Sequence, residues 1–222
     1  VLALREQGLD VAPHLSFGLD GEDTILGLLN EYRDAGIRRI VALRGDLPSG
    51  TGSGSRLVYA SELVAFIRRH TGDHFHIEVA AYPEIHPQAE NYESDVRYLK
   101  GKFDAGANAA ITQYFYNVEA YFYFLDRCAD IGIDKPIYAG IMPITNYANL
   151  ARFSKNCGAE IPRWIRRRLE GFADDAESIR AFGIDVVTQL CQTLIDSGAP
   201  GIHFYTMNQA QPTLQICRNL GL

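Results

Sequence analysis

Short apolar runs alternate with amphipathic segments along the chain. The apolar runs are typical of buried strands, and we expect strands at residues 11–17, 38–44, 76–82, 109–115, 136–142 and 201–207. Apolar residues at helical spacing occupy the intervals between them. We expect helices there at residues 22–35, 59–71, 90–105, 117–131, 146–156 and 209–220, with a longer helical stretch at 161–198. This order predicts parallel strands joined by helical crossovers.

Residues that favour helix ends support these boundaries. A glycine follows several of the expected helices, as a C-terminal cap does, and an asparagine or aspartate precedes others, as an N-terminal cap does. The expected C-terminal caps are Gly36, Gly72, Gly106 and Gly132, and the expected N-caps are Asn91 and Asp174.

Two architectures fit a run of β/α units of this kind. One is an open, doubly wound sheet, and the other is a β/α barrel of which this chain holds about six units. A sheet binds its ligand mainly at one switch point, whereas a barrel mouth recruits residues from many strands. Because polar residues follow many of the expected strands, we favour the barrel.

Composition narrows the range of partners. The 222 residues, 47% of them hydrophobic, suffice for one large α/β domain. A net charge of -6 argues against nucleic acid and anionic membranes as partners, and no signal peptide or bilayer-spanning run is visible. The spacing of the cysteines fits neither a zinc site nor a disulfide framework, so we expect reduced thiols in a cytoplasmic protein. The cysteines are Cys128, Cys157, Cys191 and Cys217.

Polar residues at the ends of the expected strands are the candidate functional residues. Arg44, Gly45 and Asp46 end one apolar run, and Gln113 stands near the end of another. The carboxyl ends of parallel strands are where α/β proteins build their sites. Glycine between two charged residues lets the backbone approach a ligand closely, although a purely structural ion pair is the alternative interpretation.

Several common sites are excluded or disfavoured. No Gly-Lys-Ser/Thr follows the glycine-rich stretch after Asp46, no GxGxxG follows a strand, and no GxSxG is present. His74 and His76 stand where a strand begins, opposite the expected mouth, so we expect no metal site there. The lysines fall on expected helices or loops, which disfavours Schiff-base chemistry.

The remaining candidate residues are of types that bind an anion and a ring system. His14 interrupts an apolar strand, and Asp95, Tyr98 and Lys102 share one face of an expected helix. That face could hold a ribose and a phosphate, although a solvated helix face is by itself the better interpretation.

Four runs in order resemble the flavin-dependent methylenetetrahydrofolate reductases of bacterial type. They are VALRGDLPSG, VAAYPEIHPQA, KFDAGANAAITQYFY and GIHFYTMN, and the likeness extends from about Ala12 to the C-terminus. The resemblance implies a (β/α)8 TIM barrel, with residues 1–222 forming a single catalytic domain. It implies FAD at the mouth, reduced by NAD(P)H and reoxidised by 5,10-methylenetetrahydrofolate to give 5-methyltetrahydrofolate in a ping-pong reaction. It also suggests a cytoplasmic homo-oligomer.

The same resemblance assigns roles to residues. Asp46 is the carboxylate close to both flavin and folate, and Gln113, Asn149, Phe153 and Gln209 are expected to contact substrate. The expected FAD contacts are His14, Arg44, Gly45, Asp46, Ala60, Tyr82, His86, Ala89, Asp95, Tyr98 and Lys102.

The chain departs from the family pattern at several points. It begins at Val1, and we expect it to lack the first two β/α units, including the glutamate that serves the family as general acid. Gly101 and Gln209 stand where some members have arginine. Two alternatives therefore stay open: a truncated or non-catalytic barrel that keeps only the scaffold, and another flavin barrel of the proline-dehydrogenase type.

Overall fold

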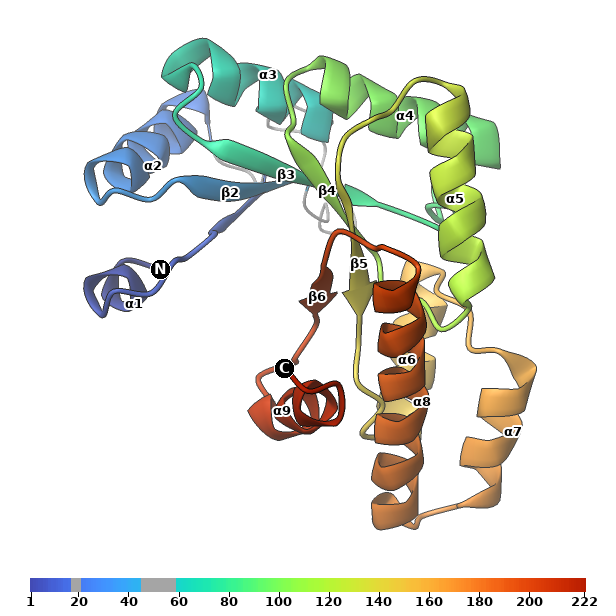
Figure 1. The fold of residues 1–222 in the computed structure, drawn as a ribbon. Coiled ribbons are helices and arrows are strands. Elements are labelled where there is room, and N and C mark those ends of the chain that lie inside the picture. The colour runs from blue at the N-terminus through green and yellow to red at the C-terminus, as the bar shows by residue number, and fades with distance from the viewer. Residues whose placement is uncertain (17–20, 45–58) are drawn as a thin grey trace. The chain divides into compact units, whose positions relative to one another are not determined.

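Six parallel strands alternate with helices in the computed structural model, which describes residues 1–16, 21–44 and 59–222 (Figure 1). The strands are β1 (His14–Ser16), β2 (Arg39–Leu43), β3 (His76–Ala81), β4 (Ala109–Thr112), β5 (Ile137–Ile141) and β6 (Ile202–Phe204). The helices are α1 (Leu2–Glu6), α2 (Glu22–Asp34), α3 (Ala60–Thr71), α4 (Tyr92–Asp104), α5 (Val118–Asp130), α6 (Tyr147–Cys157), α7 (Arg163–Gly171), α8 (Ala176–Asp196) and α9 (Ala210–Asn219).

The strands follow one another in the sheet in the order in which they occur in the chain. A doubly wound sheet requires the strand order to reverse at a switch point, and no reversal occurs among the described strands. Sequential order is that of a β/α barrel. The fold prediction is therefore confirmed as six units of a (β/α)8 barrel.

Most of the expected elements are present, and two details are corrected. The stretch 161–198 is two helices, α7 and α8, because the chain turns at Ala173, which has a left-handed φ of 49°. The N-cap of α8 is Asp175 and not Asp174, since the Asp175 carboxylate accepts a hydrogen bond from the backbone N–H of Ser178 at 3.1 Å. The predicted cap Asn91 is confirmed, because its side chain accepts from Ser94 N at 2.9 Å. Positive φ angles follow four helices at the expected glycines, Gly36, Gly72, Gly106 and Gly132.

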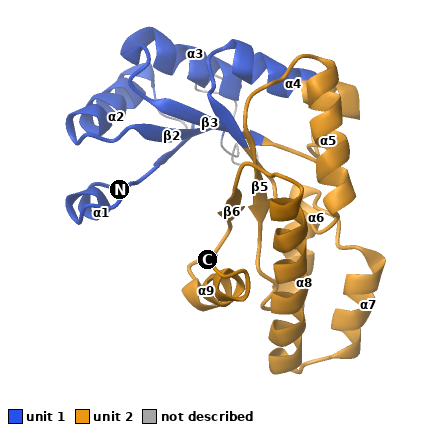
Figure 2. Ribbon diagram, viewed as in Figure 1, with its two compact units in different colours: residues 1–80, 97–110 blue, residues 81–96, 111–222 orange. Residues whose placement is uncertain are grey.

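The chain divides into two compact units (Figure 2). Unit 1 comprises residues 1–80 and 97–110, and unit 2 comprises residues 81–96 and 111–222. In unit 1, β1, β2 and β3 pair in parallel, with Arg39 in register with His76, and α3 packs on β2. Burial of apolar side chains from both elements is the main force that holds this layer together. They include Ile40, Ala42, Leu63, Val64 and Ile67, which are all fully buried.

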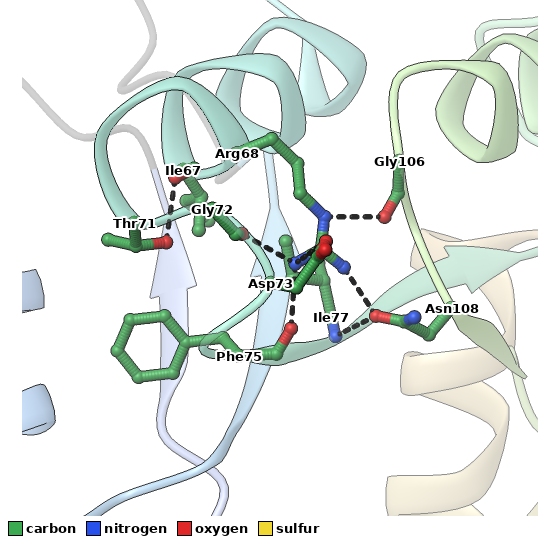
Figure 3. Close-up of polar contacts among 9 residues, drawn as sticks. All are labelled: Ile67, Arg68, Thr71, Gly72, Asp73, Phe75, Ile77, Gly106 and Asn108. Atoms are coloured by element: carbon green, nitrogen blue, oxygen red, sulfur yellow. Dashed lines mark hydrogen bonds and ion pairs between the residues drawn. The ribbon is translucent and has the colours of Figure 1, made fainter.

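Arg68 of α3 joins the helix to the beginnings of two strands in unit 1 (Figure 3). Its guanidinium donates to the carbonyl oxygens of Phe75 at 2.8 Å and Gly106 at 2.9 Å and to Oδ1 of Asn108 at 2.5 Å. Asn108 Oδ1 also accepts from the backbone N–H of Ile77 at 2.8 Å. Burial lowers the pKa of Arg68, and the charge of Asp73 partly offsets this.

In unit 2, β4, β5 and the residue after β6 lie very close together. The Thr112 hydroxyl accepts from the backbone N–H of Gly140 at 2.8 Å, and the Tyr205 hydroxyl donates to the Thr112 carbonyl at 2.9 Å. A Cβ on Gly140 would lie only 2.0 Å from the Thr112 carbonyl oxygen. Only glycine fits at this position of β5. Helix α8 covers β5 and also contacts α5 and α9.

No helix in the described part of the chain is both long and apolar enough to cross a bilayer. All four cysteines are free, with Cys128 and Cys191 buried and Cys157 and Cys217 partly exposed.

Candidate functional site

Two predicted residues of unit 1 lie at opposite kinds of strand terminus, His14 at the beginning of β1 and Arg44 after the last residue of β2. Arg44 directly follows β2 and is half-buried, while Gly45 and Asp46 lie outside the described residues. His14 is exposed at the first position of β1, in register with Val41 in the middle of β2. Arg44 therefore stands at a strand exit, whereas His14 does not.

Three further predicted contacts of unit 1 lie on α3 and α4. Ala60 is the first residue of α3 and is buried. The Lys102 ammonium donates to the carbonyl oxygen of Ala80 at 2.7 Å, so its charge lies at the carboxyl end of β3. Tyr98 is 59% exposed. The structure thus brings Lys102 to a strand exit and leaves Tyr98 on the surface.

The beginning of β3 carries a different cluster in unit 1. Arg39 forms an ion pair with the buried Glu78 at 2.5 Å, and His76 Nε2 lies 3.8 Å from the same carboxylate. Desolvation lowers the pKa of His76, which the charge of Glu78 partly opposes. No group of three potential metal ligands occurs among the described residues.

The segment after β3, residues 82–89 in unit 2, is held in a specific conformation. The rings of Tyr82 and His86 meet edge to face with centroids 4.5 Å apart, and Asp95 Oδ2 accepts from the backbone N–H of His86 at 2.8 Å. Ala89 N donates to the His86 carbonyl at 2.8 Å. Ile85 has a φ of 68°, a strained value for a β-branched residue. The structure thus brings the predicted residues Tyr82, His86, Ala89 and Asp95 together.

Gln113 directly follows β4, and its side-chain amide has a defined orientation. Its backbone N–H donates to the Ala81 carbonyl at 2.8 Å, which continues the pairing of β3 with β4. Its Oε1 accepts from the backbone N–H of Tyr114 at 3.0 Å. Since the oxygen is engaged, the NH2 group is what Gln113 offers to a ligand as a donor.

Helix α6 carries the predicted residues Asn149 and Phe153. The Asn146 side chain caps the helix by accepting from Asn149 N at 2.8 Å. The Asn149 side chain is exposed and accepts from the Arg152 guanidinium at 3.3 Å. That guanidinium also lies 5.3 Å from the centre of the half-buried Phe153 ring. Both predicted residues are accessible on the first two turns of α6.

Gln209 precedes α9 as its N-cap residue and is exposed. The turn before it contains two residues with positive φ, Met207 at 50° and Asn208 at 58°, and Gln209 N donates to the Thr206 carbonyl at 2.9 Å. At the other departure from the family pattern, Gly101, no atom lies within 4 Å of the position that a Cβ would occupy. A larger side chain would therefore fit on α4 at this position.

A small pocket in unit 2 is lined by predicted residues and by Glu84, to which the sequence assigned no role. Tyr82 and Gln113 line it together with Glu84, Tyr114 and Cys157; the remaining lining residues are Pro83, Ile85, Gly158 and Ala159. Glu84 Oε2 accepts from the backbone N–H of Glu160 at 2.8 Å, whereas Glu84 Oε1 is buried with no hydrogen-bond partner. The only signal for Glu84 in the sequence was its place shortly after an apolar strand, within the run VAAYPEIHPQA.

Burial raises the pKa values of two groups that line this pocket. Desolvation raises the pKa of Glu84 to about 7, opposed by the hydrogen bond from Glu160 N and supported by the Glu160 charge. Burial also raises the pKa of Tyr114, whose hydroxyl lies 3.0 Å from Ser154 Oγ and 3.4 Å from the donating thiol of Cys157. Strongly shifted titratable groups in a concave site are typical of functional positions.

Comparison with known proteins identifies close relatives. The family model described as methylenetetrahydrofolate reductase matches residues 2–221. The 5,10-methylenetetrahydrofolate reductase of Escherichia coli K12 is 42% identical over 215 residues, which is 97% of this chain and 71% of that protein. The corresponding protein of Buchnera aphidicola from Schizaphis graminum is 39% identical over 98% of this chain and 73% of its own length.

Among solved structures, a Clostridium thermocellum protein is similar over 97% of this chain and 95% of its own, with a TM-score of 0.51 and 17% identity. It is described as an uncharacterized protein that binds two copies of 5-methyl-5,6,7,8-tetrahydrofolic acid. At this level of identity the likeness concerns the fold.

Proposed function

Because this chain belongs to the methylenetetrahydrofolate reductase family, we propose that it reduces 5,10-methylenetetrahydrofolate to 5-methyltetrahydrofolate. We further propose that NAD(P)H is the reductant, that FAD carries the hydride, and that the two substrates react in turn. The match over residues 2–221 carries the proposal. The polar residues at the exits of β2, β3 and β4 support it, since they stand where a β/α barrel binds its ligands.

The described residues suit FAD. Lys102 and Arg44 are cations at strand exits and would bind the diphosphate. Asp95 Oδ2 accepts from the backbone N–H of His86, and a carboxylate at this position would accept a ribose hydroxyl. Tyr82 and His86 would provide an aromatic surface. When bound, FAD supplies the ring that exchanges hydride with nicotinamide and folate.

Gln113 and Phe153 suit substrate binding. The Gln113 NH2 group would donate to a carbonyl oxygen of the folate or of the nicotinamide, because its Oε1 is engaged by Tyr114 N. Phe153 would stack on either ring system. Asp46 would stabilise positive charge that develops on the folate, which is the role its carboxylate suits chemically.

The test is the absorption spectrum of the purified full-length protein, recorded without oxygen. Loss of the flavin band on addition of NADH or NADPH, and its return with 5,10-methylenetetrahydrofolate, would support both halves of the reaction. A protein that cannot be loaded with FAD would overturn the proposal in favour of a non-catalytic scaffold. Reoxidation that requires other substrates, with proline able to reduce the flavin, would instead favour the proline-dehydrogenase type.

A further inference from the structure

We propose that Glu84 is a positioning residue of the reductase site, whose carboxyl group fixes the end of α6 against the segment after β3. This inference rests on the proposed function, because it treats Tyr82 and His86 as flavin contacts and Phe153 as a substrate contact. Nothing in the family resemblance assigned a role to Glu84.

The contact joins two segments that are far apart in the sequence. Glu84 Oε2 accepts from the backbone N–H of Glu160, across 76 positions in the chain, at 2.8 Å. Next to it, a Cβ on Gly158 would lie 3.1 Å from Pro87 Cγ and 3.8 Å from the Ile85 carbonyl oxygen. The residues just after α6 therefore pack directly on the segment that contains Tyr82 and His86.

A second set of contacts joins the last turn of α6 to Tyr114, in the segment after β4. The Tyr114 hydroxyl lies 3.0 Å from Ser154 Oγ, and the Cys157 thiol donates to it at 3.4 Å. Ser154 directly follows Phe153, and Tyr114 directly follows Gln113. The two proposed substrate contacts are thus one residue away from a buried hydrogen-bonded pair. A shift at this end of α6 would move the Phe153 ring relative to the Gln113 amide.

Glu84 is the member of this arrangement whose pKa lies near neutrality. Its Oε1 is buried in the pocket without a partner, so a neutral carboxyl fits the pocket better than a carboxylate. Among the described residues, the titratable groups around it are the Glu160 carboxyl, the Tyr114 hydroxyl, the Cys157 thiol and the Tyr82 hydroxyl, and none of these is a cation that would pair with a carboxylate. Burial raises the pKa of Glu84 to about 7, so Glu84 ionises above neutrality. The hydrogen bond from Glu160 N favours the carboxylate, but water drawn to the buried, unpartnered Oε1 would separate the two packed segments.

The main experiment compares Glu84→Ala with Glu84→Gln in the full-length, FAD-loaded protein. Glu84→Ala removes the acceptor for Glu160 N. We expect the KM for 5,10-methylenetetrahydrofolate to rise roughly tenfold, because the Phe153 ring would no longer be held in place relative to the Gln113 amide, while flavin content is retained. Glu84→Gln keeps a neutral acceptor. We expect the KM of the native protein to rise above pH 7. Glu84→Gln should restore the native KM at pH 6 and abolish that rise.

The matched control is Glu160→Gln, which keeps the backbone donor and removes only the exposed charge beside Glu84. The Glu160 charge raises the pKa of Glu84, so this variant should keep the native KM at pH 6 and shift the pH profile to lower pH. A Glu84→Ala protein with the native KM at every pH would overturn the proposal. Equal impairment of Glu84→Ala and Glu84→Gln at pH 6 would overturn it as well.

Amide hydrogen exchange separates this inference from the proposed function. Glu84→Ala should increase exchange at residues 154–160, whether or not the protein turns over folate, and unchanged exchange there would overturn the positioning role. If native protein shows this protection but no folate-dependent reoxidation of flavin, the proposed function fails while the contact stands. If Glu84→Ala does not fold, the deciding measurement is the KM of the native protein compared with that of Glu84→Gln between pH 6 and pH 8.

Discussion

The guanidinium of Arg68 donates to Oδ1 of Asn108 at 2.5 Å, and the same oxygen accepts from the backbone N–H of Ile77 at 2.8 Å. One amide oxygen thus joins α3 to the beginning of β3 (Figure 3). The Arg68 side chain is only 17% exposed, so the carbonyl groups that it satisfies have little access to water. The cluster lies at the amino ends of the strands, where barrel residues serve stability.

Arg68→Ala should destabilise the protein strongly. It leaves the carbonyls of Phe75 and Gly106 without their donor, and the cost of several buried unsatisfied groups is about 3 kcal/mol. Urea unfolding followed by circular dichroism would measure this. Arg69→Ala is the matched control, because its side chain is exposed on the same helix, and it should change the free energy of unfolding by less than about 0.5 kcal/mol. Equal effects of the two substitutions would contradict the structural role of Arg68.

Gly140→Ala should be severely disruptive. The added methyl group would lie 2.0 Å from the Thr112 carbonyl oxygen, which is backbone and cannot move aside within the sheet. We expect a loss of more than about 3 kcal/mol or failure to fold, measured by urea unfolding or by soluble yield.

Gly101→Ala is the contrasting substitution in helix α4. No atom lies within 4 Å of its added methyl group, and alanine favours helix over glycine, so stability should rise by about 0.5–1 kcal/mol. A loss of stability in Gly101→Ala comparable to that in Gly140→Ala would show that close backbone approach is not the cause.

The free energy of unfolding should depend on pH because of Glu84. Its pKa is raised in the folded state to about 7 from 4.5, so the folded protein holds this proton more tightly than the unfolded chain does. The contribution of Glu84 is therefore fully present below pH 4.5 and is lost as the pH rises to about 7. Relative to the native protein, Glu84→Gln should gain on the order of 1–2 kcal/mol between about pH 4.5 and 7.5, after allowance for solvent screening. A difference in unfolding free energy that does not vary with pH would contradict the raised pKa.

The orientation of the Gln113 amide predicts how substitutions of Gln113 affect the turnover of folate. Since Tyr114 N holds Oε1, the proposed contribution of Gln113 is the donor NH2 group. Gln113→Glu keeps the acceptor for Tyr114 N and removes that donor, so turnover of folate should fall roughly tenfold to a hundredfold. Single-turnover reoxidation of reduced flavin is the direct measurement. Gln113→Asn shortens the side chain but keeps a neutral amide with its NH2 donor, so it should lose less activity than Gln113→Glu. A greater loss in Gln113→Asn would contradict this interpretation.

Several features could be predicted from the pattern of residues. The order of strands and helices followed from short apolar runs and helical spacing, because burial on parallel strands and on one helix face imposes those periods. Cap residues such as Asn91 and Gly72 were identified correctly, since their roles depend on local backbone geometry. The break between α7 and α8 was missed because no proline marks it, and the left-handed Ala173 has no signature in the sequence.

The sequence by itself determined the β/α order, the barrel class and the strand exits that carry Arg44 and Gln113, since these follow from local pattern and resemblance. Only the tertiary structure decided what Glu84, Arg68 and Gly140 do. Their partners, Glu160, Asn108 and Thr112, come from distant parts of the chain. Burial and close approach between such segments are properties of packing, and no local periodicity encodes them.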